Sequence, residues 1–399
     1  MKHALTLTLA LTTASLAHAQ QITLKGRVID EKRQPVPYAN VGQLGNEPGT
    51  ATNEAGEFSL RVASLPRKIT VVSLGYAPTT VDVSSATEPL LIVLKSSTVA
   101  LPEVRVRNPE QVATELVKRA YAKLARHQRQ EQYGKAFYRQ KQEHNGKYSE
   151  FLDAFYDVRF TNQGVGGWQL EQARYATAAE ETGVDMTNFS AAVRLIPVFE
   201  PKPSRRTLAV PLSPLADKQF KFHLREVLQD KGQETAVIDF TPRLDLNQPA
   251  AFGTLYLDFK TAAIRRLESN VPIGNLMSLQ FSEGTTLTSQ TFRMVTEFSP
   301  VADSLSRLQA VRAEQTIVLS YQGKPDSTEI SGNLFFYQNT TKPAAKGYKS
   351  TGVNYNDLKQ AMKQNYNAKF WRDREILRAS PVEEKVIRDL EQRKAFGSF

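Results

Sequence analysis

The feature that most constrains this chain is the region from residue 133 to 340, where apolar and polar side chains alternate in segment after segment. Alternation with a period of two is typical of β-strands that have one buried face. Short polar turns separate the segments, and Asn145-Gly146 is a strong hairpin signal. One segment of helical period precedes them. We therefore predict a mainly β protein, with a helix and a large curved antiparallel sheet in an α+β domain.

The helix is expected to begin directly after Asn108. Asn108 is a favourable N-cap, Pro109 suits the first helical position, and Gln111 completes a capping box. From Val112 onward, apolar residues recur at every fourth position as far as Leu124. This spacing gives one apolar stripe, which should pack on the sheet.

One hairpin, over residues 253–268, resembles the repeating hairpin of periplasmic lipoprotein-carrier half-barrels. In that family the sheet wraps a helix and can hold an acyl chain. The resemblance implies a half-barrel as one possible form of the sheet. An ordinary meander of strands would produce the same pattern, so both architectures stay open.

Residues 1–19 are predicted to be a signal peptide. Lys2 precedes a short apolar run over residues 4–16, and Ala17-His18-Ala19 supplies the small residues that signal peptidase requires. The run is shorter than the roughly 20 residues of a membrane-spanning helix, and no later segment approaches that length. We expect cleavage before Gln20 and export to the periplasm or to the periphery of the outer membrane.

The chain contains no cysteine. This excludes a lipoprotein anchor, disulfides, cysteine-zinc sites and thiol nucleophiles. The fold must therefore be stabilised by its hydrophobic cores alone.

Residues 20–95 contain six or seven short strands, which predict a seven-stranded β-sandwich. Four blocks stand there in order: Gly26-x-Val28-x-Asp30, Pro35-Val36-Pro37-x-Ala39-x-Val41, Gly49-Thr50-x-Thr52-Asn53-x-x-Gly56-x-Phe58 and Ser73-Leu74-Gly75-Tyr76. They resemble the carboxypeptidase-regulatory-like domain, a transthyretin-like β-sandwich. The resemblance implies a structural or docking module without an active site, at the N-terminus of an uncharacterised Gram-negative envelope protein.

The remaining boundaries follow from composition and pattern. Residues 96–107 contain Pro102 and are predicted to be a linker. The helix and the large sheet occupy residues 108–340, and residues 341–399 form a C-terminal helical segment with 13 basic and 7 acidic side chains.

Two helices are expected in the C-terminal segment. Asn356 caps the first, in which Leu358, Met362, Tyr366 and Phe370 recur every fourth residue. The capping box Ser380-Pro381-Val382-Glu383 starts the second, which carries Val386, Ile387 and Leu390. Helices this short are marginal alone, so their apolar stripes should dock either on the chain's own sheet or on a partner.

The strongest catalytic candidate is His223-Leu224-Arg225-Glu226, which matches the first half of the zinc site of metallocarboxypeptidases. That site needs a second histidine downstream, and His223 is the last histidine of the chain. The segment also alternates like a strand, so we expect His223 and Glu226 to point to opposite faces. The sequence therefore predicts no zinc site.

The other candidate residues do not indicate a catalytic, phosphate-binding or EF-hand site. Asp153 and Asp157 share one face of a strand and are expected to be solvent-facing. Gly164-Val165-Gly166-Gly167 lacks the residues of a phosphate loop and is predicted to be a hairpin turn. The loop residues Glu180, Glu181 and Asp185 could bind calcium loosely, but they do not have the spacing of an EF-hand. Phe399 does not end a lipid-facing strand.

We therefore expect a non-enzymatic binding or scaffold protein with no catalytic, cofactor-binding or metal-binding residues. Its partner should be an envelope protein or a lipid, and nucleic acid is a poor candidate for an exported chain without a recognition module. The alternatives are a half-barrel carrier that shelters an acyl chain or a lipoprotein, and a hydrolase without a recognisable motif.

Overall fold

The computed structural model describes residues 22–43, 48–97, 108–177, 188–203, 207–230, 233–272, 284–300, 306–350, 355–393 and 396. The predicted signal peptide and nearly all of the predicted linker lie outside these residues, as does the loop with Glu180, Glu181 and Asp185. Within the described residues, no helix is both long and apolar enough to cross a bilayer.

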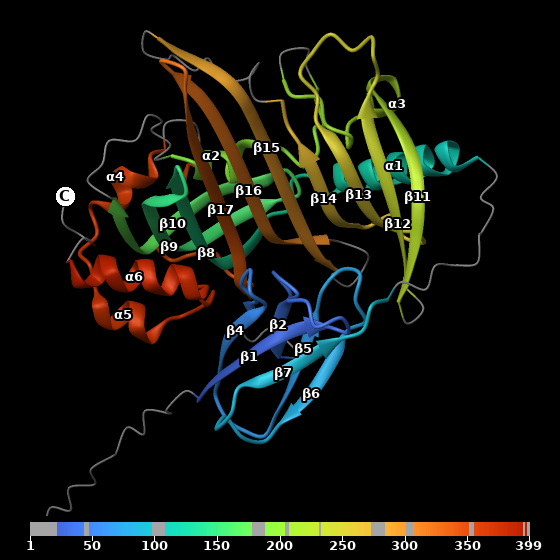
Figure 1. Cartoon of the computed structure of the whole chain (residues 1–399). Helices are drawn as coiled ribbons and strands as arrows, with labels where there is room; N and C mark the ends of the chain where they lie inside the picture. Colours follow the sequence, from blue (N-terminus) through green and yellow to red (C-terminus); the bar gives the residue numbers. More distant parts are fainter. Residues whose placement is uncertain are drawn as a thin grey trace, which may run out of the picture.

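The N-terminal domain is a seven-stranded sandwich of two sheets (Figure 1). Its strands are β1 (Ile22–Asp30), β2 (Asn40–Gln43), β3 (Thr50–Ala51), β4 (Glu57–Val62), β5 (Arg67–Val72), β6 (Thr79–Val83) and β7 (Leu90–Leu94). One sheet has the order β4-β1-β7 and the other β3-β2-β5-β6. Phe58 is fully buried between them, and Gly56 adopts a φ of 74°, which favours glycine. The predicted sandwich is confirmed.

An 11-stranded sheet forms the body of the molecule, and it is antiparallel throughout. Its strands are β8 (Gln132–His144), β9 (Lys147–Thr161), β10 (Gly164–Thr177), β11 (Phe220–Asp230), β12 (Gln233–Pro242), β13 (Phe252–Asp258), β14 (Ile264–Asn270), β15 (Thr285–Pro300), β16 (Ser306–Tyr321), β17 (Lys324–Thr340) and β18 (Lys349–Ser350). The order is β11 to β17, then β8, β9, β10 and β18. The pairing of β17 with β8 therefore joins two meanders into one sheet.

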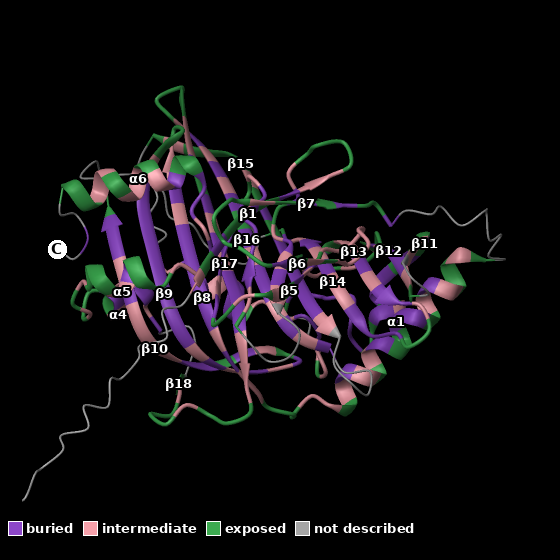
Figure 2. Cartoon of the chain, turned by 90° about the horizontal axis from the view of Figure 1, so that it is seen from below, coloured by how far each residue is buried: buried purple, intermediate pink, exposed green. Residues whose placement is uncertain are grey.

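The part of the sheet that β8 and β9 form is buried on both of its faces. Figure 2 shows long buried stretches along β8 and β9. In β9, Leu152, Ala154 and Tyr156 belong to the core under α1, whereas Phe151 and Phe155 pack on the C-terminal segment. This burial explains why the sequence of β9 is almost continuously apolar.

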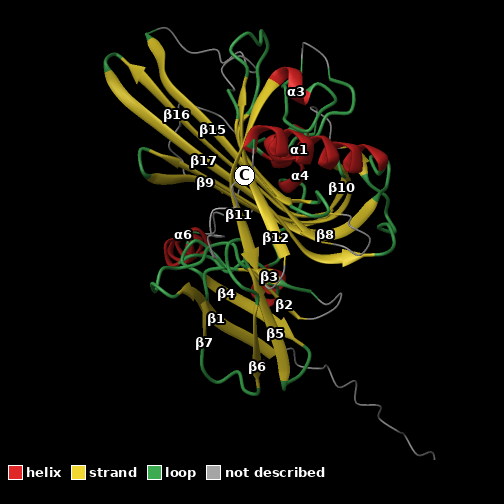
Figure 3. Ribbon diagram, turned by 90° about the vertical axis from the view of Figure 1, so that its right-hand side faces the viewer, coloured by secondary structure: helices red, strands yellow, loops and turns green. Residues whose placement is uncertain are grey.

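Helices α1 (Pro109–Arg126), α2 (Ser190–Leu195), α3 (Ala216–Gln219) and α4 (Asp357–Ala361) lie on the concave side of the sheet (Figure 3). The apolar stripe of α1 is buried there as predicted, and Asn108 caps the helix through the Gln111 backbone N–H. The sandwich, α5 (Ala368–Asp373) and α6 (Pro381–Gln392) lie on the convex side. The structure thus confirms a mainly β architecture with a large curved sheet and C-terminal helices.

The prediction that the first part of the C-terminal segment forms a single helix is wrong. This part forms two short helices, α4 and α5, each with its own asparagine cap. Leu358 packs into the concave core, but Phe370 packs on the convex side, and Met362 between them is 45% exposed. The chain passes around the β10 and β18 edge of the sheet between these two residues, so one straight helix cannot hold them both.

The second predicted helix is confirmed as α6, with the capping box between Ser380 and Glu383 in place. Ile387 and Leu390 pack near Phe151 and Phe396. We call residues 366–393, together with Phe396, the C-terminal clasp. The sequence analysis left open whether these helices dock on the chain's own sheet or on a partner. The structure shows that the clasp docks on the chain's own sheet.

Candidate functional site

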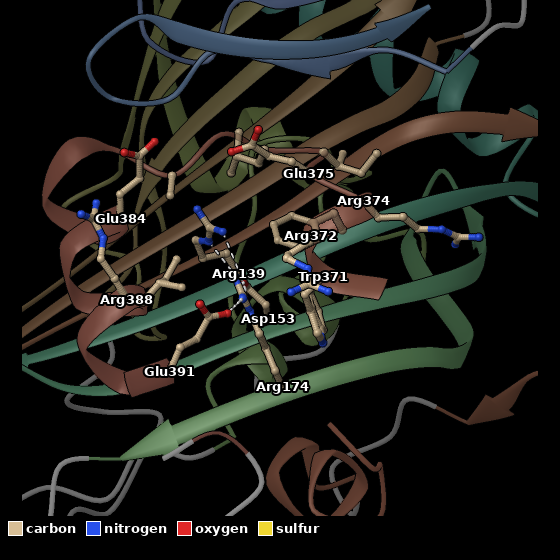
Figure 4. Close-up of a pocket in the computed structure, with 15 residues that line it drawn as sticks. Arg139, Asp153, Arg174, Trp371, Arg372, Arg374, Glu375, Glu384, Arg388 and Glu391 are labelled. Carbon is tan, nitrogen blue, oxygen red and sulfur yellow. Dashed lines mark hydrogen bonds and ion pairs between the residues drawn. The ribbon is translucent and has the colours of Figure 1, made fainter. Parts of the chain in front are cut away.

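A row of three charged side chains crosses the convex face of the sheet beneath the C-terminal clasp (Figure 4). Arg139 of β8 stands opposite Asp153 of β9, which stands opposite Arg174 of β10. Nε and Nη2 of Arg139 donate to the two carboxylate oxygens of Asp153 at 2.8 and 3.1 Å. Nη2 of Arg174 donates to Oδ2 of Asp153 at 2.7 Å. One carboxylate therefore holds two guanidinium groups.

The row continues into α6 through Glu383. Its carboxylate lies 3.3 Å from Nη1 of Arg139 and 3.0 Å from Nζ of Lys141, and it also accepts the backbone N–H of Ser380 at 2.7 Å. The residue that closes the capping box thus also ties α6 to the sheet. We call Arg139, Lys141, Asp153, Arg174 and Glu383 the clasp network.

The clasp network is largely withdrawn from water, which decides its charge state. Burial alone would raise the pKa of Asp153, but Arg139 and Arg174 hold it below its usual value. Burial likewise opposes the ionisation of Glu383, and Arg139 and Lys141 outweigh it and lower the pKa. Both carboxylates are therefore ionised at neutral pH. Each carboxylate is held in ion pairs. This arrangement suits a structural role and does not suit a group that transfers protons.

The expectation that Asp153 faces solvent is wrong, since its side chain has no exposed surface. Asp157 does lie on the same face, where it pairs with Lys135 at 3.2 Å and is 27% exposed. The sequence analysis did not single out Arg139 and Arg174. A signal for these residues is present in the sequence. On an apolar strand, a charged residue shares a face with buried aromatic residues, as Arg139 does with Phe137 two positions earlier.

A cavity of about 360 Å³ lies beside the clasp network, between the sheet and α6. Figure 4 shows Glu384, Arg388 and Glu391 along α6 on one side and Trp371 and Arg372 on the other. Trp371 stacks on Arg174, whose guanidinium carbon is 4.5 Å from the ring centroid. Acidic and basic side chains alternate around the rim, so the cavity has no strong preference for one sign of charge.

A larger hollow, about 490 Å³, lies between the sandwich and the sheet. We call it the junction groove. Val72, Leu74 and Tyr76 line it on the sandwich side, and Leu228 and Phe298 line it on the sheet side. Val72 is 45% exposed although it belongs to a well-packed strand. A hollow of this size with apolar walls at a domain boundary is the usual setting of a ligand site.

Charged groups at the base of the junction groove are paired with one another. Arg266 contacts Glu297 and lies 3.3 Å from Glu268, while Nη1 of Arg312 lies 3.1 Å from Glu297. Burial opposes the charge on Glu297, but the two arginines keep its pKa below the usual value. The base is thus a fixed ionic surface, and the apolar walls above it remain open.

The concave side of the sheet holds a second buried charge, Asp357 at the start of α4. It is 1% exposed, and neither carboxylate oxygen has a hydrogen bond of normal geometry in the described structure. Burial raises its pKa to about 6, against smaller opposing effects of Ser190 and Arg194. Arg194 lies beside the rings of Trp168 and Tyr355, 5.1 and 5.2 Å from their centroids. This cluster is buried, so it affects the stability of the fold and is not open to a ligand.

The histidine candidate requires a correction. A register shift in β11 places Asp239 opposite His223 and Val237 opposite Glu226. Because Asp239 and Val237 are two residues apart, His223 and Glu226 lie on the same face, and both are exposed. The prediction that His223 and Glu226 point to opposite faces of the strand is therefore wrong. Among the described residues, however, no three His, Asp or Glu side chains gather closely enough to hold a metal.

The glycine-rich segment is not itself the turn of its hairpin. Asn162 and Gln163 make the turn, and Gly164 pairs with Thr161 as the first residue of β10. A bulge follows between Val165 and Gly167. By contrast, the hairpin at Asn145 and Gly146 forms as predicted, with φ values of 49° and 74°.

Residues 24–106 match the family described as the CarboxypepD_reg-like domain, which confirms the resemblance of the N-terminal sandwich. The match covers only that part of the chain. A comparison with curated proteins gives no match.

Three solved structures resemble parts of the chain. They are a DUF1329 family protein from Desulfovibrio piger, a LolA superfamily protein from Nitrosomonas europaea and a putative membrane-associated protein of unknown function from Bacteroides fragilis. Their identities are 12, 8 and 10%, and their TM-scores are 0.23, 0.20 and 0.16. The alignments cover 57, 56 and 80% of this chain and 93, 93 and 99% of the other chains. Scores this low carry no argument about function.

Proposed function

We propose that this chain is a non-enzymatic binding or scaffold protein of the Gram-negative envelope, and that it binds its ligand or partner in the junction groove. The chain would act after export, in the periplasm or at the periphery of the outer membrane. The targeting pattern of residues 1–19 supports this location.

The observation that carries the proposal is the contrast between the concave side of the sheet and the junction groove. On the concave side, α1, α2 and α4 pack with buried side chains such as Phe199 and Leu212 into one continuous core. The junction groove instead leaves apolar side chains facing an open hollow of about 490 Å³. A filled interior with open apolar surface elsewhere is expected of a binding protein.

The orientation of the two walls of the junction groove is fixed by several contacts. The backbone N–H of Gly49 donates to the Tyr337 carbonyl oxygen at 2.8 Å, and Lys141 lies 3.2 Å from Glu54. Arg312 lies over the ring of Tyr38, 4.2 Å from its centroid. A groove held in one shape binds with a smaller entropy cost than one that must form on binding.

The competing reading, a carrier that shelters an acyl chain, would require the concave core to open. Lipid extraction of the protein purified from envelopes, followed by mass spectrometry, distinguishes the two. We expect no stoichiometric lipid. An acyl chain bound at one per protein that remains when Val72→Trp fills the junction groove would favour the carrier.

Photo-crosslinking in intact cells tests the groove itself. A photoreactive amino acid in place of Val72 should give a discrete adduct with the partner. The same amino acid in place of Leu244, which is 99% exposed and does not line the groove, is the matched control. Identical adducts from both positions, or adducts from position 244 alone, would contradict the proposal.

A further inference from the structure

The cavity of about 360 Å³ beside the clasp network, which we call the clasp cavity, has no role in the proposed function. Phe137, Leu377 and Ala379 give it a buried apolar wall. Its volume falls within the range of roughly 300–1,000 Å³ that is usual for small-molecule sites. The clasp cavity is therefore large enough for a small organic ligand.

Most of the charged side chains that line the clasp cavity already have partners. Outside the clasp network these are Arg374, which pairs with Glu171 at 2.6 Å, Glu384, which lies 3.6 Å from Arg378, and Glu391, which accepts the Tyr366 hydroxyl at 2.7 Å. Among the described residues, no side chain of opposite charge lies within 4 Å of the remaining three, Arg372, Glu375 and Arg388. The charges left for a ligand are thus two cations and one anion.

The three unpaired charges come from different parts of the C-terminal clasp. Arg372 belongs to α5, Arg388 belongs to α6, and Glu375 lies in the connection between these helices (Figure 4). A guanidinium group binds a carboxylate through two parallel hydrogen bonds, and a carboxylate such as Glu375 binds an ammonium group. A ligand that carries both a carboxylate and an ammonium group satisfies both signs.

Trp371 supplies an independent indication of a ligand. It lines the clasp cavity and is 7% exposed, and its Nε1 has no hydrogen-bond partner in the described structure. The ring is held in place by Phe155 and Phe370, at centroid distances of 5.4 and 5.5 Å. A buried N–H without an acceptor is costly, and an oxygen atom of a ligand would satisfy it. The indole N–H thus favours a ligand with an oxygen acceptor.

We propose that the clasp cavity binds a small zwitterion, an amino acid or short peptide with free ends and an apolar side chain. Its carboxylate would lie between Arg372 and Arg388, and its ammonium group would lie at Glu375. Its apolar side chain would pack on Leu377 and Ile387, which also line the cavity. Such a ligand contacts both helices of the clasp, so its binding should raise the melting temperature of the folded chain.

Isothermal titration calorimetry of the full chain with L-leucine and L-leucyl-L-leucine tests the proposal. We expect one of these zwitterions to bind at one per protein. Its N-acetylated form lacks the ammonium group, and its C-terminal amide lacks the carboxylate. Each blocked form should bind at least about tenfold more weakly. Equal binding of a blocked form, or no binding of either zwitterion, would overturn the proposal.

Variants of the chain place the ligand in the clasp cavity. Arg388→Gln and Glu375→Gln should each weaken binding at least about tenfold. Lys385→Gln and Asp373→Asn make the same changes of charge at exposed positions that do not line the cavity, and they should leave the affinity unchanged. Unchanged melting temperatures without ligand would show that all four variants fold.

The junction groove provides a further control. Val72→Trp fills that groove and should leave binding of the zwitterion unchanged. Loss of binding in this variant would place the ligand in the junction groove and overturn the proposal. Equal effects of the cavity variants and their charge-matched controls would also overturn it, because net charge alone would then explain the binding.

Discussion

Arg139 and Asp153 face each other across two neighbouring strands, and the guanidinium group meets both carboxylate oxygens at 2.8 and 3.1 Å with almost no exposure to water. The pair lies under the C-terminal clasp, where Glu383 adds a second carboxylate to the same guanidinium. A buried charge is tolerated only when its partners stay in place. The attachment of the clasp and the stability of the sheet are therefore linked.

Asp153→Asn should strongly destabilise the protein. The substitution keeps the size of the side chain but leaves Arg139 and Arg174 without their shared counter-charge in a buried setting. We expect a loss of about 3–5 kcal/mol in the free energy of unfolding, measured by urea denaturation.

Asp82→Asn is the matched control for Asp153→Asn. Asp82 pairs with Lys68 on the surface, where the two side chains are 76% and 60% exposed. Removal of such a pair should change the free energy of unfolding by less than about 1 kcal/mol. Equal effects at the two positions would show that the buried network does not stabilise the fold.

Asp357 makes the stability of the protein depend on pH in the mildly acidic range. Burial raises its pKa to about 6, above the ordinary value of 3.8, so the folded chain binds this proton more tightly than the unfolded chain does. The resulting stabilisation is complete below pH 4 and is lost as the pH rises through 6.

Asp357→Asn should remove this dependence. The variant should gain stability relative to the wild type between pH 5 and 8, by up to about 3 kcal/mol. Urea denaturation at several pH values measures the difference. A difference that is the same at pH 4 and pH 8 would show that Asp357 does not titrate in this way.

The sequence predicted the elements whose signals are local. The cap of α1, the capping box of α6, the Asn145-Gly146 turn and the sandwich strands each depend on residues that are close in sequence. The break between α4 and α5 could not be predicted in this way. Leu358 and Phe370 share a helical spacing, and only the position of the sheet edge between them shows that they pack on opposite faces.

The candidate site was less predictable than the fold. Asp153 looked like a surface charge because its two arginine partners lie on neighbouring strands, 14 and 21 residues away. The same limit applies to His223 and Glu226, because one register shift reverses the alternation on which their orientation was judged. The junction groove belongs to two domains, so neither domain's sequence reveals it alone.

The predicted export has a direct measurement. Mass analysis of the protein from the envelope fraction should give an N-terminus at or next to Gln20. Substitution of Ala17 and Ala19 by a bulky residue should block cleavage and leave the unprocessed chain. An intact Met1 in the periplasmic fraction of wild-type cells would contradict the prediction.

Deletion of everything after Gly352 removes α4 together with the C-terminal clasp, and it tests the role of the clasp as a joint between the two domains through their cohesion. The clasp contacts the sheet through Phe370 and Trp371, which pack on Phe155 with centroid distances of 5.3 and 5.4 Å. It contacts the sandwich through a backbone bridge between Leu377 and Ala51. The Ala379 carbonyl oxygen also accepts from Asn53 at 3.2 Å.

The truncated chain should therefore lose stability and domain cohesion together. Each large apolar side chain that is uncovered costs roughly 1.5–3 kcal/mol, so the loss should amount to several kcal/mol. Limited proteolysis between residues 96 and 107 should then release the sandwich as a separate fragment, whereas the nicked full-length chain should elute as one species. Trp371→Ala is the milder companion variant, and it should weaken the sheet contact while the chain stays folded. A truncated chain that keeps its melting temperature and loses only co-purifying proteins would show that the clasp serves a partner, and one that keeps both would contradict both roles.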